Sequence, residues 1–158
     1  GSLFVECTPV GGVQVPTSVV GNDAGLAGAL PPSLGDLGPS SLTKLGLRSN
    51  ALTSVPTEIG ALTGLRNLDL SGNALASLPT ELGALTSLQA AYLRRNALTS
   101  VPTEIAALTA LTTLNLANNQ LAGVPTEFRT VDPANECMLW NNPGFSCANV
   151  AFSATVCC

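Results

Sequence analysis

Apolar and polar residues alternate in short segments through the middle of the chain. In the segment LTKLGL, Leu45 and Leu47 point to one side of an extended backbone, and Lys44, Gly46 and Arg48 point to the other. This pattern predicts a short strand that has one buried face and one exposed face.

A second apolar spacing follows each such segment. Pro56 stands where a first helical turn would begin, and Glu58 lies within that turn, near the positive end of the helix. Ile59, Leu62 and Leu65 then recur at intervals of three, which predicts a short or 3₁₀-like helix packed on a core.

The strand and helix signals recur every 23 residues. The positions in phase are Asn50, Asn73, Asn96 and Asn119; Pro56, Pro79, Pro102 and Pro125; and Glu58, Glu81, Glu104 and Glu127. One coil cannot bury its apolar face alone, so stacked coils with a parallel sheet are predicted. An amide at the turn can bond the backbone of adjacent coils, so the asparagines are interpreted as structural.

The pattern LxxLxLxxNxL followed by xxPxxIxxL resembles the leucine-rich-repeat family, in particular its 23-residue Ras-suppressor and plant Ras-group-related types. An earlier segment, Leu26 to Leu37, is similar to a plant extracellular variant, and a two-residue insertion, Gly38-Pro39, follows it. The resemblance covers residues 26–128. It implies an α/β solenoid, a curved right-handed coil with a parallel sheet on its concave face and short α or 3₁₀ helices on its convex face.

A single domain over residues 1–158 is predicted, because a solenoid needs caps at both ends of its core. Residues 1–25 fit the repeat poorly and are assigned to an N-terminal cap, residues 26–128 to about five repeats, and residues 129–158 to a C-terminal cap. The run WNNPGFSC from Trp140 to Cys147 resembles the Cys-rich caps of extracellular leucine-rich-repeat proteins, with Trp140 expected as a lid on the last coil.

Cysteine usage gives the expected compartment. The tail holds Cys137, Cys147, Cys157 and Cys158. Four cysteines so close together predict two disulfides and an extracellular or secreted protein, with a cytoplasmic location as the alternative. The adjacent pair is expected to reach separate partners, in an order left open. Zinc is a weaker interpretation because no CxxC pair occurs. Cys7 is expected to remain unpaired, because several coils separate it from the tail.

Composition excludes several functions. The chain has no His, which removes His-dependent catalysis and His-ligated metal sites. The row of glutamates lies outside any expected cleft, so no enzyme, cofactor or metal is predicted. No apolar run is long enough to span a membrane. The net charge of −4 argues against nucleic acid as a partner.

The family resemblance implies ligand binding on the concave sheet, and the strand pattern shows which residues face it. The candidate binding residues are Lys44, Arg48, Arg66, Asp69, Tyr92, Arg94, Arg95 and Asn115. Five of the six basic residues but one of the ten acids fall on this face. It therefore carries a predicted charge of +4, and the rest of the chain carries −8.

The middle strand combines surface and core exceptions. Tyr92 is the chain's one tyrosine and lies beside Arg94 and Arg95, and Tyr and Arg are residue types that dominate interface energies. Ala91 replaces a leucine that the neighbouring repeats bury, which is a core defect that a functional site could tolerate. A merely solvated basic surface is the alternative interpretation.

These observations favour a non-enzymatic, receptor-like recognition module that binds an acidic protein or peptide. An anionic polysaccharide of a cell wall or matrix is the second hypothesis, since paired arginines bind carboxylates and sulfates well. A surface role such as ice binding is a third, suggested by the convex row Thr57, Thr80, Thr103 and Thr126. The oligomeric state is not readable from the sequence.

Overall fold

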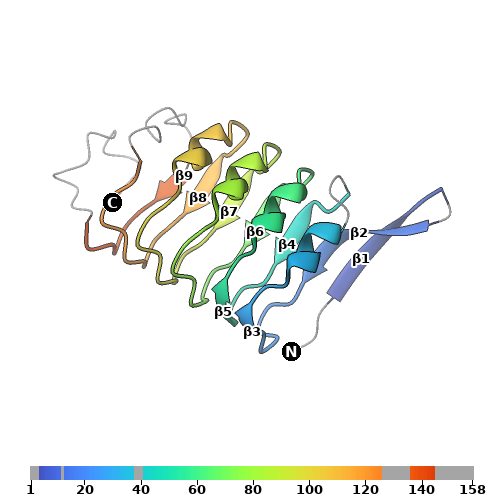
Figure 1. Ribbon diagram of the computed structural model, residues 1–158, viewed down its shortest axis with the longest axis horizontal. Helices are drawn as coiled ribbons and strands as arrows, with labels where there is room; N and C mark the ends of the chain where they lie inside the picture. The colour runs from blue at the N-terminus through green and yellow to red at the C-terminus, as the bar shows by residue number, and fades with distance from the viewer. Residues whose placement is uncertain (1–3, 12, 38–40, 126–135, 145–158) are drawn as a thin grey trace.

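The computed structural model describes residues 4–11, 13–37, 41–125 and 136–144. The chain winds into a solenoid in which a sheet runs along one side and short helices run along the opposite side (Figure 1). The predicted α/β leucine-rich-repeat fold is confirmed by this arrangement. The helices among the described residues are all of the 3₁₀ type.

The long sheet contains seven strands in the order β1-β2-β4-β6-β7-β8-β9. Its repeat strands are β4 (Lys44–Gly46), β6 (Asn67–Asp69), β7 (Ala90–Tyr92), β8 (Thr113–Asn115) and β9 (Glu136–Met138). They are parallel, and each residue pairs with the residue 23 positions later in the chain. Equivalent side chains of successive coils therefore form straight rows across the sheet.

The N-terminal end of the sheet differs from the repeats. Strand β1 (Phe4–Val10) pairs antiparallel with β2 (Val13–Val20), which then pairs parallel with β4. Ser18 lies opposite Lys44, a step of 26 residues, so this coil is longer than the others. Strands β3 (Ala27–Ala29) and β5 (Ala51–Ser54) form a separate two-stranded sheet.

The opposite side carries four 3₁₀ helices of five residues each: η1 (Pro32–Asp36), η2 (Thr57–Ala61), η3 (Thr80–Ala84) and η4 (Thr103–Ala107). A proline precedes each of them, with φ between −63° and −74°, because its ring fixes the entry angle. Helices η3 and η4 pack closely at Gly83, where a Cβ atom would lie 2.6 Å from the Glu104 carbonyl oxygen.

A single leucine core fills the space between the sheet and the helices. The middle residues of the strands, Leu45, Leu68, Ala91 and Leu114, are at most 2% exposed, and they stack in register. Ile59, Leu62 and Leu65 are completely buried, as the spacing of three predicted. Aliphatic burial of this kind is the main stabilising contribution to a solenoid.

The asparagines bond one coil to the next. Asn96 donates from Nδ2 to the carbonyls of Leu93 and Leu70, both at 3.0 Å, and its Oδ1 accepts the amide hydrogen of Leu75 at 3.1 Å. Asn73 and Asn119 repeat this geometry. Each side chain therefore satisfies backbone groups that the turn would otherwise bury without partners.

The C-terminal segment continues this ladder, which the sequence analysis did not foresee. Asn142 lies 23 residues beyond Asn119, donates to the carbonyls of Leu116 and Leu139, and accepts the amide hydrogen of Leu121. Residues 136–142 therefore follow the repeat's backbone within the segment assigned to a cap. No leucine marks β9 at the position opposite Leu114, where Cys137 stands, and this concealed the repeat.

The lid role expected for Trp140 is wrong. Trp140 is 44% exposed, whereas the preceding Leu139 is 1% exposed and belongs to the core. The backbone alternation decides this, since neighbouring residues of an extended segment face opposite sides.

The disulfides predicted for Cys137, Cys147, Cys157 and Cys158 lie outside the described side chains. Cys7 is exposed in β1 and is a free thiol among the described residues. Strands β1 and β9 occupy opposite ends of the sheet, so Cys7 is remote from Cys137.

Replacing Asn96 with Ala should lower the free energy of unfolding by roughly 3 kcal/mol, because three buried backbone groups lose their partner. Urea denaturation followed by circular dichroism measures this change. The exposed Gln120→Ala provides a control that should change it by less than about 0.5 kcal/mol. Equal stability of the two variants would contradict a structural role for the ladder.

Candidate functional site

The repeat register arranges the concave side chains in rows that run across the strands. One row consists of Gly46, Asp69, Tyr92 and Asn115, which pair directly in the sheet. The adjacent row consists of Arg48, Ser71, Arg94, Ala117 and Trp140, and is aligned by amide bonds from the following residues, for example from Gly72 to the Arg94 carbonyl at 2.9 Å. We call this second set the clasp row.

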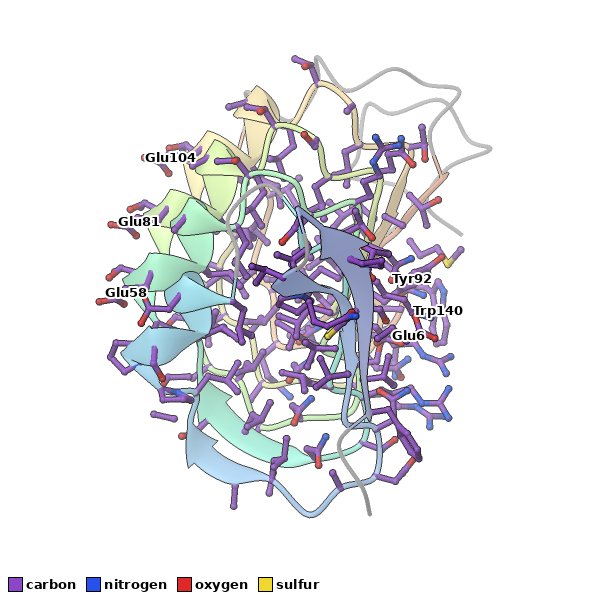
Figure 2. All side chains as sticks on the ribbon, turned by 90° about the vertical axis from the view of Figure 1, so that its right-hand side faces the viewer. Glu6, Glu58, Glu81, Tyr92, Glu104 and Trp140 are labelled. Carbon is purple, nitrogen blue, oxygen red and sulfur yellow. The ribbon has the colours of Figure 1, made fainter. Side chains whose placement is uncertain are left out.

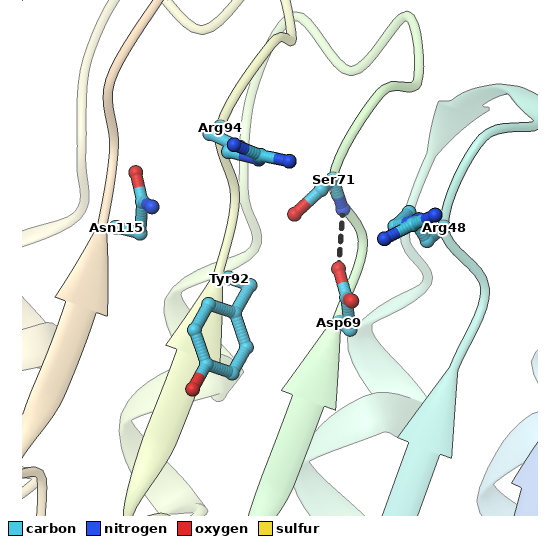
Figure 3. A pocket seen from close by; sticks show the side chains of 6 residues that line it. All are labelled: Arg48, Asp69, Ser71, Tyr92, Arg94 and Asn115. Carbon is cyan, nitrogen blue, oxygen red and sulfur yellow. Dashed lines mark hydrogen bonds between the residues drawn. The ribbon is translucent and has the colours of Figure 1, made fainter.

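A pocket of about 280 Å³ opens between these two rows on the concave face. Its lining residues are Arg48, Asp69, Ser71, Tyr92, Arg94 and Asn115. Figure 3 shows the side chains of Arg48 and Arg94 extending toward Ser71 from opposite sides, with Asp69 and Tyr92 on the neighbouring row. Ser71 is only 4% exposed, so the two guanidinium groups flank a small and low residue.

Local hydrogen bonds hold two polar walls of the pocket. The amide of Ser71 donates to Oδ1 of Asp69 at 3.0 Å, and the amide of Ala117 donates to Oδ1 of Asn115 at 3.2 Å. Each side chain bonds the backbone two residues later, a turn that Asx residues favour. Tyr92 lies between them in the same row, so its ring stands between two fixed polar groups.

The structure brings together five of the eight predicted binding residues. Arg48, Asp69, Tyr92, Arg94 and Asn115 line the pocket, whereas Lys44, Arg66 and Arg95 lie exposed outside its lining. Ser71 is a sixth lining residue, absent from the predicted set. Its position in the repeat pattern marked it as concave, but its small size gave no sign of a contact role.

Arg95 occupies a strained backbone position. Its φ is +55°, in the left-handed region, where the equivalent residues are Ser49, Gly72, Asn118 and Asn141. Glycine and asparagine tolerate this conformation, whereas a residue with a long side chain adopts it at a cost. Strain of this kind is retained most often where a side chain has a function, which strengthens the case for Arg95 as a contact residue.

The two long sides of the molecule differ in charge. In Figure 2, Tyr92 and Trp140 lie on the side opposite Glu58, Glu81 and Glu104. Glu6 also lies on the concave side, because it pairs with Ser18 and thus aligns with Lys44. Counting Glu6 changes the predicted charge of this face from +4 to +3, and the face remains basic.

The exposed indole of Trp140 adds an aromatic group to the concave face. It stands at the end of the clasp row, beyond Arg94 and the fully buried Ala117. The sequence analysis counted Tyr92 as the one aromatic residue of this face. A second repeat-like asparagine, Asn142, was the signal that could have placed Trp140 in the row.

Two other kinds of site were examined on the described residues. Within those residues, no three His, Cys, Asp or Glu side chains gather closely enough to hold a metal ion. No helix in the same part of the chain has the length and apolarity needed to cross a membrane.

Comparison with known families identifies the repeat. A model of the leucine-rich-repeat family matches residues 40–98 and 63–121, which together cover half of the chain. The chain therefore belongs to the leucine-rich-repeat family. A comparison with curated proteins found no significant match.

Several solved structures share this fold. A chain in the BIR3–SERK2 complex of Arabidopsis thaliana is 32% identical, with 90% of this chain and 75% of that chain covered and a TM-score of 0.72. A plant ice-binding protein is 31% identical over 87% of this chain and 45% of its own, with a TM-score of 0.75. The Leptospira interrogans leucine-rich-repeat protein LIC12759 is 36% identical, with a TM-score of 0.65. The match covers 72% of this chain but only 29% of that longer protein.

Replacing Arg95 with Gly should raise the free energy of unfolding by roughly 0.5–1 kcal/mol, because glycine accepts positive φ without a steric cost. The same change one residue earlier, Arg94→Gly, is the matched control and should be destabilising, because the φ of Arg94 is not positive. Urea titrations compare the two. A loss of stability in both variants would show that Arg95 is not strained.

Proposed function

We propose that this protein is a non-enzymatic recognition module that binds an acidic protein or peptide on its concave face. The observation that carries the proposal is the pocket in which Arg48 and Arg94 flank Ser71 beside Tyr92. Two guanidinium groups and a phenol at one point give charge attraction and a rigid contact surface together. Lys44, Arg66 and Arg95 surround this point as exposed positive charges.

The charge distribution would steer such a partner to one side of the molecule. The exposed basic residues of the concave face attract acidic groups over several ångströms, whereas the glutamates of η2, η3 and η4 repel them from the convex face. Attraction of this kind weakens as salt screens it. Asp69 within the pocket disfavours indiscriminate binding of anions, since one of its oxygens is free of the bond to Ser71.

The solved relatives support a recognition role outside the cell. One structure shows BIR3 in complex with SERK2, and another describes an ectodomain of the related BIR2. We accordingly propose an extracellular location, repeats of the 23-residue Ras-suppressor or plant type, and a disulfide-bonded Cys-rich C-terminal cap. The 23-residue register of the strands agrees with that repeat length.

An anionic polysaccharide is the alternative occupant of the same pocket. Paired arginines also bind uronate and sulfate groups, and Trp140 supplies a second aromatic surface on which a sugar ring could stack. The peptide is favoured because the two aromatic residues lie on different rows and are separated by the polar Asn115.

Replacing both Arg48 and Arg94 with Ala should weaken binding of Asp- and Glu-rich peptides by about tenfold or more, because the paired charges at the pocket are lost. Fluorescence anisotropy with labelled acidic peptides and their Asn and Gln counterparts measures this, at low and at physiological salt.

A matched control carries the same change in net charge on the opposite side. Ala61→Glu with Ala84→Glu alters two exposed positions of η2 and η3. Binding should remain within about twofold of the unsubstituted protein, since these positions lie outside the concave face. An equal loss in both variants would reduce the effect to overall charge and refute the pocket as the site.

Ice binding remains a second candidate because the chain resembles a plant ice-binding protein over 87% of its length. The convex threonines are poorly suited to it, because Thr57, Thr80 and Thr103 donate their hydroxyl hydrogens to Glu58, Glu81 and Glu104 in a charged row. The turn side of the coils is better suited. It exposes small uncharged residues at equivalent positions: Thr53, Ser54, Ala76, Ser77, Thr99 and Ser100.

This candidate predicts measurable thermal hysteresis that disappears in Ala76→Lys, because a long cation disrupts a flat uncharged surface. The Arg48→Ala, Arg94→Ala variant is the control and should retain the full effect. Freezing-point measurements under a microscope decide this, and absence of hysteresis in the unsubstituted protein removes the candidate.

A further inference from the structure

The clasp row has a period twice that of the repeat. Its members alternate in size: Arg48 is large and exposed, Ser71 is 4% exposed, Arg94 is large, Ala117 is fully buried and Trp140 is 44% exposed. Backbone bonds keep all five aligned across five coils. Two guanidinium groups and one indole therefore stand as separate contact points, with a small residue between each pair.

The spacing of these contact points constrains the partner. Adjacent strands lie about 4.8 Å apart, so every second strand recurs at about 9.6 Å. A polyproline-II helix repeats every three residues, which corresponds to about 9.3 Å. A β-strand presents side chains on one face about 6.6 Å apart, and an α-helix returns to the same face after seven residues, at about 10.5 Å. Over two intervals the polyproline-II repeat deviates least while still meeting every contact point.

The chemistry of the contact points defines the ligand's side chains. Arg48 and Arg94 require acidic groups, whereas the exposed indole of Trp140 offers a flat apolar surface for a proline ring. Asp69 lies on the neighbouring row, so the acidic groups are expected over the clasp row, toward the row that contains Ser49 and Arg95. Arg95 adds a further positive charge on that side.

We propose that the concave face binds an acidic polyproline-II segment running across the strands. Two acidic residues three positions apart contact Arg48 and Arg94, and a proline three positions further contacts Trp140. This inference rests on the proposed function and specifies its partner. A prolyl backbone is preformed in this conformation, so little conformational entropy is lost when it is bound.

Synthetic peptides test the spacing directly. The peptide PPPEPPEPPP places the acidic residues three apart and fits in either chain direction. PPEPPPPEPP has the same composition with the acidic residues five apart. PPPQPPQPPP removes the charge, and GGGEGGEGGG keeps the charge spacing without the stiff backbone. Trp140 is the single tryptophan of the chain, so its fluorescence reports whether a peptide reaches the end of the row.

The first peptide should bind about tenfold more tightly than each of the other three and should change the Trp140 fluorescence. Calorimetry should show that Trp140→Ala weakens its binding several-fold. The Ala61→Glu, Ala84→Glu control should leave its binding unchanged. The Trp140→Ala variant retains the backbone carbonyl that accepts the Asn118 amide hydrogen, and circular dichroism checks its fold.

The contrary outcomes separate this inference from the proposed function. If all acidic peptides bind equally and still require Arg48 and Arg94, the polyproline-II partner is wrong and the acidic-peptide function stands. If no peptide binds in an arginine-dependent way, both fail. If tetragalacturonate binds more tightly than every peptide and requires the same arginines, the partner is a polysaccharide and the inference is overturned.

Discussion

The amide ladder from Asn50 to Asn142 is the interaction on which the rest of this structure depends. Each coil must turn sharply after its strand, and the turn leaves backbone groups in a leucine core that contains no water or other polar group to bond them. The asparagine side chain bonds its own turn and the preceding coil at once, as Asn96 does with Leu93 and Leu70. A neutral side chain with both a donor and an acceptor is required here, which explains why the position does not vary among the repeats.

This ladder also has a consequence for recognition. Because every coil is bonded to the next at the same point, the register cannot slip, and concave residues 23 positions apart are held in straight rows. The rows allow substitutions on the concave surface without disturbing the core. Arg48, Ser71 and Arg94 differ in size and charge, whereas Leu47, Leu70 and Leu93 remain leucines beside them. Function can thus vary along a row while the fold stays constant.

The middle coil departs from the repeat both inside and outside. Ala91 is completely buried between Leu68 and Leu114, and it therefore buries less apolar surface than its neighbours. Tyr92 and the strained Arg95 follow within four residues. A coil that loses core area and retains backbone strain is expected where the surface has a function, because stability is otherwise improved easily at such positions.

The sequence by itself determined the repeat length, the alternation of the strands, the buried leucines and the side of the sheet on which each basic residue lies. These features depend on local periodicity, which needs no knowledge of the distant chain. The tertiary structure alone decided the rest. It placed Trp140 at the end of the clasp row, because the register of β9 follows from pairing with β8 and not from a leucine pattern. It also placed Glu6 on the concave face through an antiparallel strand outside the repeat, and it gave Arg95 a positive φ, since both depend on contacts between coils.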